Sequence, residues 1–271
     1  LVLSNADLVS FASLDQFVLR GYGSIDLIGE TRLGSTSLAG LTLDTPLLRG
    51  RTSESGAAPQ AQITAAQIHL ANSANSVSTA STGTGTLIAQ AERIVIGDGS
   101  KSVSGFSDVR LVASSSVSSQ GQGSLRAAAA LTIDTPRVVA LGGSVQTISA
   151  IDDGGEGAPV YSAVALNGTP PPAVEVSDAN RTELGGRIVL EGQRVSVSNT
   201  VEARSGQITL AARGSGTDDA VTLSSGAMLD ARGQSKSFNG TRVLADGGAV
   251  AISTAAGRVA VEAGASIDVS A

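Results

Sequence analysis

The sequence lacks cysteine and tryptophan and is poor in several other residue types that globular domains normally use. Its 271 residues include 33 glycines but only one histidine, one methionine, two tyrosines and four phenylalanines. Without cysteine no disulfide can form, and one histidine leaves too few ligands for an ordinary zinc site. With 2% aromatic residues, the 41% of hydrophobic residues must build a core mainly from alanine, valine, leucine and isoleucine.

Positive charge and long apolar runs are also scarce. The formal net charge is −6, and the 18 basic residues include only two lysines, Lys101 and Lys236. Basic residues do not cluster or alternate with aromatic ones, so the sequence predicts no nucleic-acid partner. No apolar stretch approaches the roughly 20 residues needed to cross a bilayer, so no membrane span is predicted.

What the sequence has instead is a repeated pattern of short segments, most of which alternate apolar with small or polar residues. In the C-terminal third the clearest segments are 187–190, 207–210, 220–223, 249–252 and 258–261. Glycine, asparagine, serine and aspartate separate them, and three segments recur in units of roughly 20 to 25 residues. This pattern predicts an all-β fold, a right-handed parallel β-helix (β-solenoid) with three short strands per coil.

The same pattern identifies core positions. Val197, Ile208, Val250 and Val259 each occupy the apolar phase of a predicted strand, so we expect all four to be buried. A longer duplication supports the repeat: the segment LTLDTP at 41–46 returns as LTIDTP at 131–136. We interpret residues 1–271 as a single β-helix fragment of a longer protein, because both ends interrupt the repeat.

Strand periodicity stops in residues 151–184, which contain four of the seven prolines. Since proline cannot donate to a strand ladder, this stretch is predicted to be a proline-rich insertion outside the coil. Long loops on rigid scaffolds often bind partners, so it is also the candidate interaction loop, although a passive insertion is the simpler interpretation. The candidate residues are Asp152, Asp153, Tyr161, Pro170, Pro171 and Pro172.

Residues for catalysis or cofactor binding are missing from the sequence pattern. His69 lies between two apolar residues, so it should point out of the coil without catalytic partners. The adjacent pairs Asp152-Asp153 and Asp218-Asp219 lie in or near glycine-containing turns, where aspartate commonly bonds local backbone. Side chains of neighbouring residues on an extended chain point in opposite directions, so neither pair forms an acid–base couple alone. The sequence predicts no enzyme activity, no catalytic residue, no metal and no cofactor.

Several segments together resemble a known family. They are 23–26 (GSID), 41–46 (LTLDTP), 63–70 (ITAAQIHL), 91–96 (AERIVI), 229–233 (LDARG) and 257–271. In this order they are similar to the filamentous-haemagglutinin-like large exoproteins, the passengers of two-partner secretion in Gram-negative bacteria. The resemblance covers most of the chain outside residues 151–184.

The resemblance implies a secreted or outer-membrane-associated protein at the cell surface, with an outer-membrane transporter as its partner during secretion. The implied function is a structural rod segment of an adhesin that displays loops for cell or matrix adhesion. Its ligand, on a host cell, a bacterium or a polysaccharide, stays open. Two alternatives are a carbohydrate-active β-helix enzyme (polysaccharide lyase or hydrolase) and the stalk of a contact-dependent toxin-delivery exoprotein.

Overall fold

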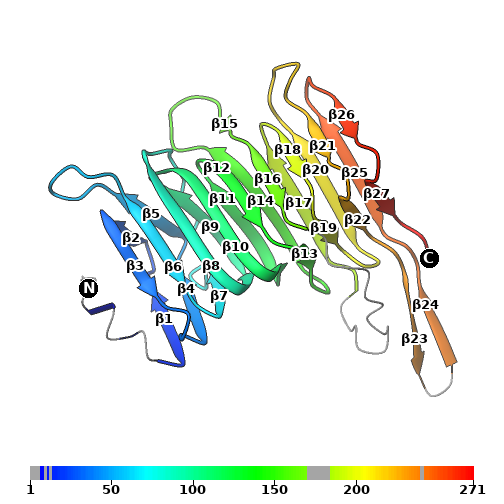
Figure 1. Ribbon diagram of the computed structural model, residues 1–271, viewed down its shortest axis with the longest axis horizontal. Coiled ribbons are helices and arrows are strands. Elements are labelled where there is room, and N and C mark those ends of the chain that lie inside the picture. Colours follow the sequence, from blue (N-terminus) through cyan, green and yellow to red (C-terminus); the bar gives the residue numbers. More distant parts are fainter. Residues whose placement is uncertain (1–6, 9–10, 12–13, 170–183, 239–240) are drawn as a thin grey trace.

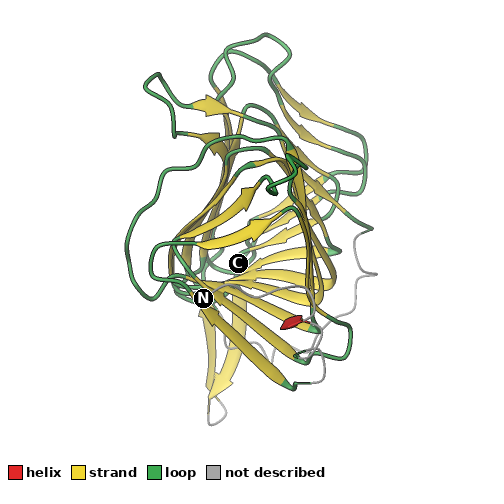
Figure 2. Cartoon of the chain, turned by 90° about the vertical axis from the view of Figure 1, so that its left-hand side faces the viewer, coloured by secondary structure: helices red, strands yellow, loops and turns green. Residues whose placement is uncertain are grey.

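The computed structural model describes residues 7–8, 11, 14–169, 184–238 and 241–271. Its strands wind into a parallel β-helix, and Figure 1 shows the coils stacked from the N-terminal to the C-terminal side. Figure 2 views the stack from the N-terminal side and shows strands surrounding the interior, with loops outside. A complete coil has three strands, one on each of three faces, so the predicted fold class is confirmed.

Each face is a stack of parallel strands. Face 1 consists of β3 (Glu30–Gly34), β6 (Gln60–Thr64), the first parts of β8 (Gly85–Ile96) and β10 (Phe106–Ser119), β12 (Ala130–Asp134), β16 (Val164–Asn167), β18 (Val195–Val197), β21 (Val221–Leu223) and β26 (Val259–Val261). Face 2 consists of β1 (Gln16–Arg20), β4 (Gly40–Asp44), β7 (Gln67–Ala71), the last parts of β8 and β10, β13 (Arg137–Ala140), β19 (Thr200–Glu202), β22 (Met228–Asp230) and β27 (Ser266–Asp268).

Face 3 consists of β2 (Ile25–Ile28), β5 (Leu47–Arg51), β9 (Gly99–Ser104), β11 (Gln122–Ala127), β14 (Val145–Asp152), β17 (Arg187–Gly192), β20 (Gln207–Ala212) and β25 (Ala249–Thr254). Strands β8 and β10 continue around the corner between faces 1 and 2 and join them into one sheet. Two antiparallel pairings add to the coil: β15 (Val160–Tyr161) with β14, and the hairpin of β23 (Gln234–Phe238) with β24 (Thr241–Ala245).

The core consists of columns of apolar side chains, to which each coil contributes one residue. One column on face 1 contains Leu33, Ile63, Ala89, Leu111, Ile133, Leu166, Val197 and Leu223. All of these side chains are at most 3% exposed. Their neighbours along the strands face outward, because side chains alternate across a strand. The narrow interior explains why small branched residues dominate the composition.

The core prediction is confirmed inside the stack and wrong at its C-terminal side. Val197 and Ile208 are fully buried, whereas Val250 is half-buried and Val259 is 47% exposed. Val259 does lie in register over the buried Val221, so its inward phase is correct. It is exposed because no further coil of residues 1–271 covers β26.

The two copies of the LTLDTP-type segment form corners with the same local hydrogen bond, but at different positions in the coil. In both copies the threonine hydroxyl donates to the carbonyl two residues later, from Thr45 to Leu47 at 3.1 Å and from Thr135 to Arg137 at 3.3 Å. The preceding strand is β4 on face 2 in the first copy and β12 on face 1 in the second. The motif therefore encodes a strand, a corner and a second strand, but not a position in the coil.

The predicted insertion at 151–184 has the wrong boundaries. Strand β14 continues to Asp152, and β16 lies inside face 1, where it pairs with β12 and β18. Only residues 153–163 leave the coil between these two strands. Pro170, Pro171 and Pro172 lie outside the described residues. The strand Val164–Asn167 was missed because it is only four residues long and follows a proline-containing loop.

One segment runs across the outside of the solenoid. Residues 72–84, which we call the strap, follow β7 at the point in the chain where a face 3 strand is expected. They form no strand, and β5 pairs directly with β9 on face 3. The outward hydroxyls of Ser102 and Ser104 donate to the strap carbonyls of Ser78 and Ser81, at 2.7 and 2.9 Å. The strap therefore lies along the outer side of face 3.

Candidate functional site

The candidate functional site is the corner between faces 3 and 1, where the chain makes long outward loops. Three connections leave the coil here: residues 52–59 after β5, 153–163 after β14 and 213–220 after β20. Other turns at this corner are short, such as Gly105 between β9 and β10 and residues 193–194 between β17 and β18. Figure 1 shows the three loops along the upper edge of the stack. We call this edge the long-loop corner.

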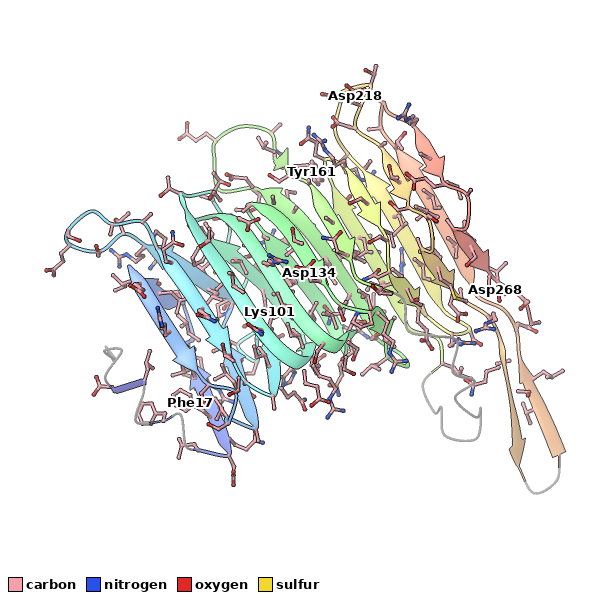
Figure 3. The ribbon with its side chains drawn as sticks, in the orientation of Figure 1. Phe17, Lys101, Asp134, Tyr161, Asp218 and Asp268 are labelled. Atoms are coloured by element: carbon pink, nitrogen blue, oxygen red, sulfur yellow. The ribbon has the colours of Figure 1, made fainter. Side chains whose placement is uncertain are left out.

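Each of the three loops presents an acidic side chain to solvent. Glu54, Glu156 and Asp218 are all exposed, and each has a glycine nearby in the sequence. Figure 3 shows Asp218 at the outer end of its loop. Because insertions in solenoids collect on one face that often binds partners, the shared position of these loops is the most specific functional signal in the molecule.

Tyr161, the only aromatic candidate, lies at the base of the second loop. It is half-buried in β15, and burial raises the pKa of its phenol, with the nearby Glu191 carboxylate adding to the shift. Arg213, at the start of the third loop, forms an ion pair with Glu191. The second and third loops thus share one polar cluster on face 3, and Tyr161 stays close to the exposed loop surface.

Asp152 and Asp153 hold the strap in place. The Asp152 carboxylate accepts a hydrogen bond from the Thr82 backbone N–H, and Asp153 accepts one from the Ala80 N–H, both at 2.8 Å. Asp153 also forms an ion pair with Arg126, which in turn donates to the Ser78 carbonyl of the strap. Their oxygens are therefore engaged mainly with the backbone of the distant strap. The local backbone bonding expected from the sequence is found only at Asp152, which also accepts from the Gly154 N–H at 3.2 Å.

A stack of carboxylates on face 2 was not found by sequence reasoning. Glu202, Asp230 and Asp268 lie in register on β19, β22 and β27, on the outward side of the strands. Arg204 bridges the first two, with distances of 3.2 Å to Glu202 and 2.9 Å to Asp230. Arg232 bridges the next two, at 3.0 Å to Asp230 and 3.4 Å to Asp268. We call these five side chains the arginine ladder.

Clustered carboxylates on one β-helix face are also the arrangement that sugar-cleaving enzymes use, so the ladder bears on the enzyme alternative. Such enzymes need one carboxyl group that can donate a proton. In the ladder the carboxylates face arginines, and the backbone N–H of Ser270, more than Arg232, lowers the pKa of Asp268. Asp230 is almost completely buried and lies between the two arginines. This arrangement binds the coils together and offers no proton donor at Asp268.

His69 points out of the coil, as predicted, but it is not surrounded by solvent. The side chain is half-buried against Gly97 of the next coil, where a Cβ atom would lie only 2.2 Å from the imidazole Nε2. Burial lowers the pKa of His69, and the positive charge of Lys101 lowers it further. The imidazole therefore acts as a neutral packing group over the turn that leads into β9.

Lys101 is the least expected residue of the core. It occupies an inward position in register with the buried Leu125 and is only 4% exposed. Its ammonium group donates to the backbone carbonyls of Gly97 and Gly99, both at 2.5 Å. Figure 3 shows Lys101 among the strands of the N-terminal half. Burial lowers the pKa of Lys101 to about 8 from an ordinary value of 10.5.

This buried lysine makes stability depend on pH in the alkaline range. Between pH 8 and 10.5 the unfolded chain keeps the Lys101 proton that the folded chain has lost, so the free energy of unfolding should rise with pH. The expected rise is at most about 3 kcal/mol. Urea unfolding of the wild type and of Lys101→Met across pH 7–11 measures it. The difference between the two curves should change through this window, and parallel curves would contradict the lowered pKa of Lys101 in the folded chain.

The hairpin of β23 and β24 was also missed. It leaves the coil between faces 2 and 3, away from the long-loop corner, and projects at the lower right of Figure 1. The sequence holds its signal: Asn239-Gly240 separates the two strands, and Asn-Gly is the preferred pair for a two-residue hairpin turn. Val243 and Leu244 on β24 are 50% and 66% exposed.

Three comparisons with known proteins were negative. No family model, curated protein or solved structure matches it. Within the described ranges, no helix has the length and hydropathy to span a membrane, and no three acidic or histidine side chains are grouped to hold a metal ion. The functional argument therefore depends on the geometry of the fold and its loops.

Proposed function

We propose that this chain is a structural rod segment of a secreted or surface-exposed bacterial adhesin, without enzymatic activity, that displays binding loops along one edge. The observation that carries the proposal is the long-loop corner. Three separate coils extend their loops at the same corner, while the intervening turns at that corner stay short. A rod whose insertions lie in one row can present several contacts to one surface at once, which strengthens weak binding through multivalency.

The interior and the ion pairs of the chain fit a mechanical role. Continuous apolar columns link successive coils, and the strap connects the turn after β7 to the end of β14 through Asp152 and Asp153. On face 2, the arginine ladder joins three successive strands. These contacts stiffen the rod, and none of them uses the exposed tips of the three loops.

The resemblance to filamentous-haemagglutinin-like exoproteins suggests where such a rod works. We propose export through an outer-membrane transporter of a Gram-negative bacterium, with a host-cell, bacterial or polysaccharide surface as the ligand. The carbohydrate-active alternative has less support, since the stacked carboxylates on face 2 are bridged by arginines. A toxin-delivery stalk would have the same rod architecture and differ in sequence outside these 271 residues.

Shortening the three loops tests the proposal. In one variant, residues 53–58, 154–159 and 214–218 are each replaced by Gly-Ser, which shortens the three connections from 8, 11 and 8 residues to 4, 7 and 5. The control variant replaces residues 235–244 of the hairpin by Gly-Ser, because the hairpin lies outside the long-loop corner. Asp152, Asp153 and Val164–Asn167 stay intact in both variants, so the strap and face 1 are preserved.

Labelled protein is then applied to epithelial cells, intact Gram-negative bacteria and immobilised neutral and anionic polysaccharides. We expect the wild type and the hairpin variant to bind at least one of these, and the loop variant to lose at least about tenfold in affinity with its β-sheet circular dichroism unchanged. Equal binding by the loop variant, or no binding by the wild type to any surface, would refute the adhesive role. Release of reducing sugar ends would support the enzyme alternative instead.

A further inference from the structure

The coil that contains the strap has strands on faces 1 and 2 but none on face 3. Strand β7 pairs with β4 and β8 on face 2, and the first part of β8 pairs with β6 and β10 on face 1. On face 3, β5 and β9 are joined by three residue pairs, whereas the other steps on this face have four to six. Face 3 is therefore one strand short at this coil and has its weakest ladder there.

The strap has the sequence of the strand that is missing. Leu70 of β7 lies in register with Ile96 of β8 on face 2. Residues 76–78 of the strap follow Leu70 at the same distance along the chain as residues 102–104 of β9 follow Ile96, and both triplets read Ser-Val-Ser. Val77 of the strap thus corresponds to the inward Val103 of the next coil.

Val77 is nevertheless outside the core, which is incompletely packed at this level. The Val77 side chain is 72% exposed. Two small cavities, of about 20 Å³ each, share four lining residues from β5, β7, β9 and β11, namely Leu48, Leu70, Val103 and Leu125. A position between Leu48 and Val103 would bury Val77 beside these cavities, and burial of an exposed valine is favourable.

The strap is fixed to the outside of face 3 through its second half. Its backbone between residues 78 and 82 is bound by side chains of β9, β11, β14 and the residue after it: Ser102, Ser104, Arg126, Asp152 and Asp153. Residues 73–77 are exposed, and none of the described residues accepts a hydrogen bond from the Val77 N–H. The outer position of the strap therefore depends on a few side chains that we call the anchors.

We propose that the strap is a displaced face 3 strand and that the rod has a second state in which residues 75–78 insert between β5 and β9. In this inserted state Val77 lies between Leu48 and Val103, and the two serines beside it face outward. The chain exchanges one short ladder for two, because the inserted segment pairs with both neighbours. Residues 79–84 then form the turn to β8 at the long-loop corner, where longer connections already leave the coil.

Insertion would make the rod extensible on one side. It lengthens face 3 by one strand spacing, about 4.8 Å, while faces 1 and 2 keep their strands. A pull along the rod separates β5 from β9 and so favours the inserted state, whereas the anchors favour the outer state. This switch does not depend on the adhesive function proposed above, since it uses only the strap, face 3 and the anchors.

Disulfide trapping tests the inserted state, because the chain has no cysteine of its own. In the outer state Leu48 is 7% exposed inside the coil and Val77 lies outside, so Leu48→Cys and Val77→Cys cannot join. In the inserted state they are neighbours on paired strands, within the Cα separation of about 4.4–6.8 Å that a disulfide needs. The control pair is Leu48→Cys with Ser76→Cys, since Ser76 is equally accessible but faces outward after insertion.

Both cysteine pairs are placed in the native chain and in a chain without two of the anchors, Asp152→Ala and Asp153→Ala, and are oxidised by glutathione disulfide without denaturant. The pair at Val77 should form its disulfide at least about tenfold faster than the pair at Ser76, and removal of the anchors should accelerate it about tenfold more. The oxidised chain should keep its β-sheet circular dichroism. Equal rates for the two pairs, loss of the β-sheet signal on oxidation, or no disulfide in the anchor-free chain would overturn the inserted state.

Hydrogen exchange gives a second measurement on chains without cysteine. In Asp152→Ala, Asp153→Ala the amide of Val77 should exchange more slowly than in the wild type, because insertion gives this N–H a backbone partner. A strap that is only released from the anchors would leave the amide exposed. Unchanged or faster exchange at Val77 in the anchor-free chain would therefore contradict insertion.

Discussion

Val197→Asp should lower the stability of the chain by at least about 4 kcal/mol. The valine side chain is 0% exposed and lies between Leu166 and Leu223 in the face 1 column. A carboxylate at this position would be desolvated without a counter-charge, which costs several kcal/mol even after local rearrangement. The urea midpoint, followed by the β-sheet signal in circular dichroism, measures the loss.

Matched substitutions nearby separate burial from the mere addition of charge. Ser196→Asp, on the outward side of the same strand, should change stability by no more than about 0.5 kcal/mol. Val259→Asp should cost clearly less than Val197→Asp, since Val259 is 47% exposed although it has the same inward phase. Equal losses for Val197→Asp and Val259→Asp would contradict the decrease in burial toward the C-terminal side.

Asp230→Asn should remove about 3 kcal/mol or more of the free energy of unfolding. The carboxylate is 3% exposed and pairs with Arg204 and Arg232 at 2.9 and 3.0 Å. Its removal leaves Arg204, which is only 15% exposed, with one fewer counter-charge, and breaking one partner of a buried pair is costly. Arg232 is 39% exposed and adds less, because solvent screens it.

An exposed pair on the same molecule serves as the control. Glu30 and Arg32 form an ion pair at 2.9 Å with side chains 67% and 73% exposed, so Glu30→Gln should change stability by no more than about 0.5 kcal/mol. Thermal unfolding of both variants at low and high salt completes the comparison. If Asp230→Asn were as mild as Glu30→Gln, the arginine ladder would not be a stabilising element of the rod.

The burial of Lys101 was not predicted from the sequence. Lys101 lies in the same phase of its strand as Val103, and both side chains are buried. A lysine in the apolar phase suggests an irregular strand, because an isolated charge is excluded from a core. It is tolerated because the turn at residues 97–99 offers backbone carbonyls within reach of the ammonium group.

The long-loop corner was only partly visible in the sequence. The loop after β14 was detected from its proline content and the lapse in strand periodicity, and Tyr161 was included in it. The loops at 52–59 and 213–220 are equally exposed but lack such a lapse in periodicity. That all three meet at one corner requires knowing how many strands separate them, and the short strand Val164–Asn167 was not recognised.

The sequence by itself determined the local features of this protein: short strands of period two, corners at glycine and Asp-Thr-Pro, and a core of small branched residues. These follow from neighbouring side chains alone, which is why Val197 and Ile208 were correctly placed. Only the tertiary structure decided which residues of different coils meet, as Glu202, Arg204 and Asp230 do. The physical reason is that parallel coils pair strands separated by loops of unequal length, so the partners stand at irregular intervals along the chain. The register of the ladder therefore depends on the segments that separate β19, β22 and β27 along the chain, including the hairpin of β23 and β24.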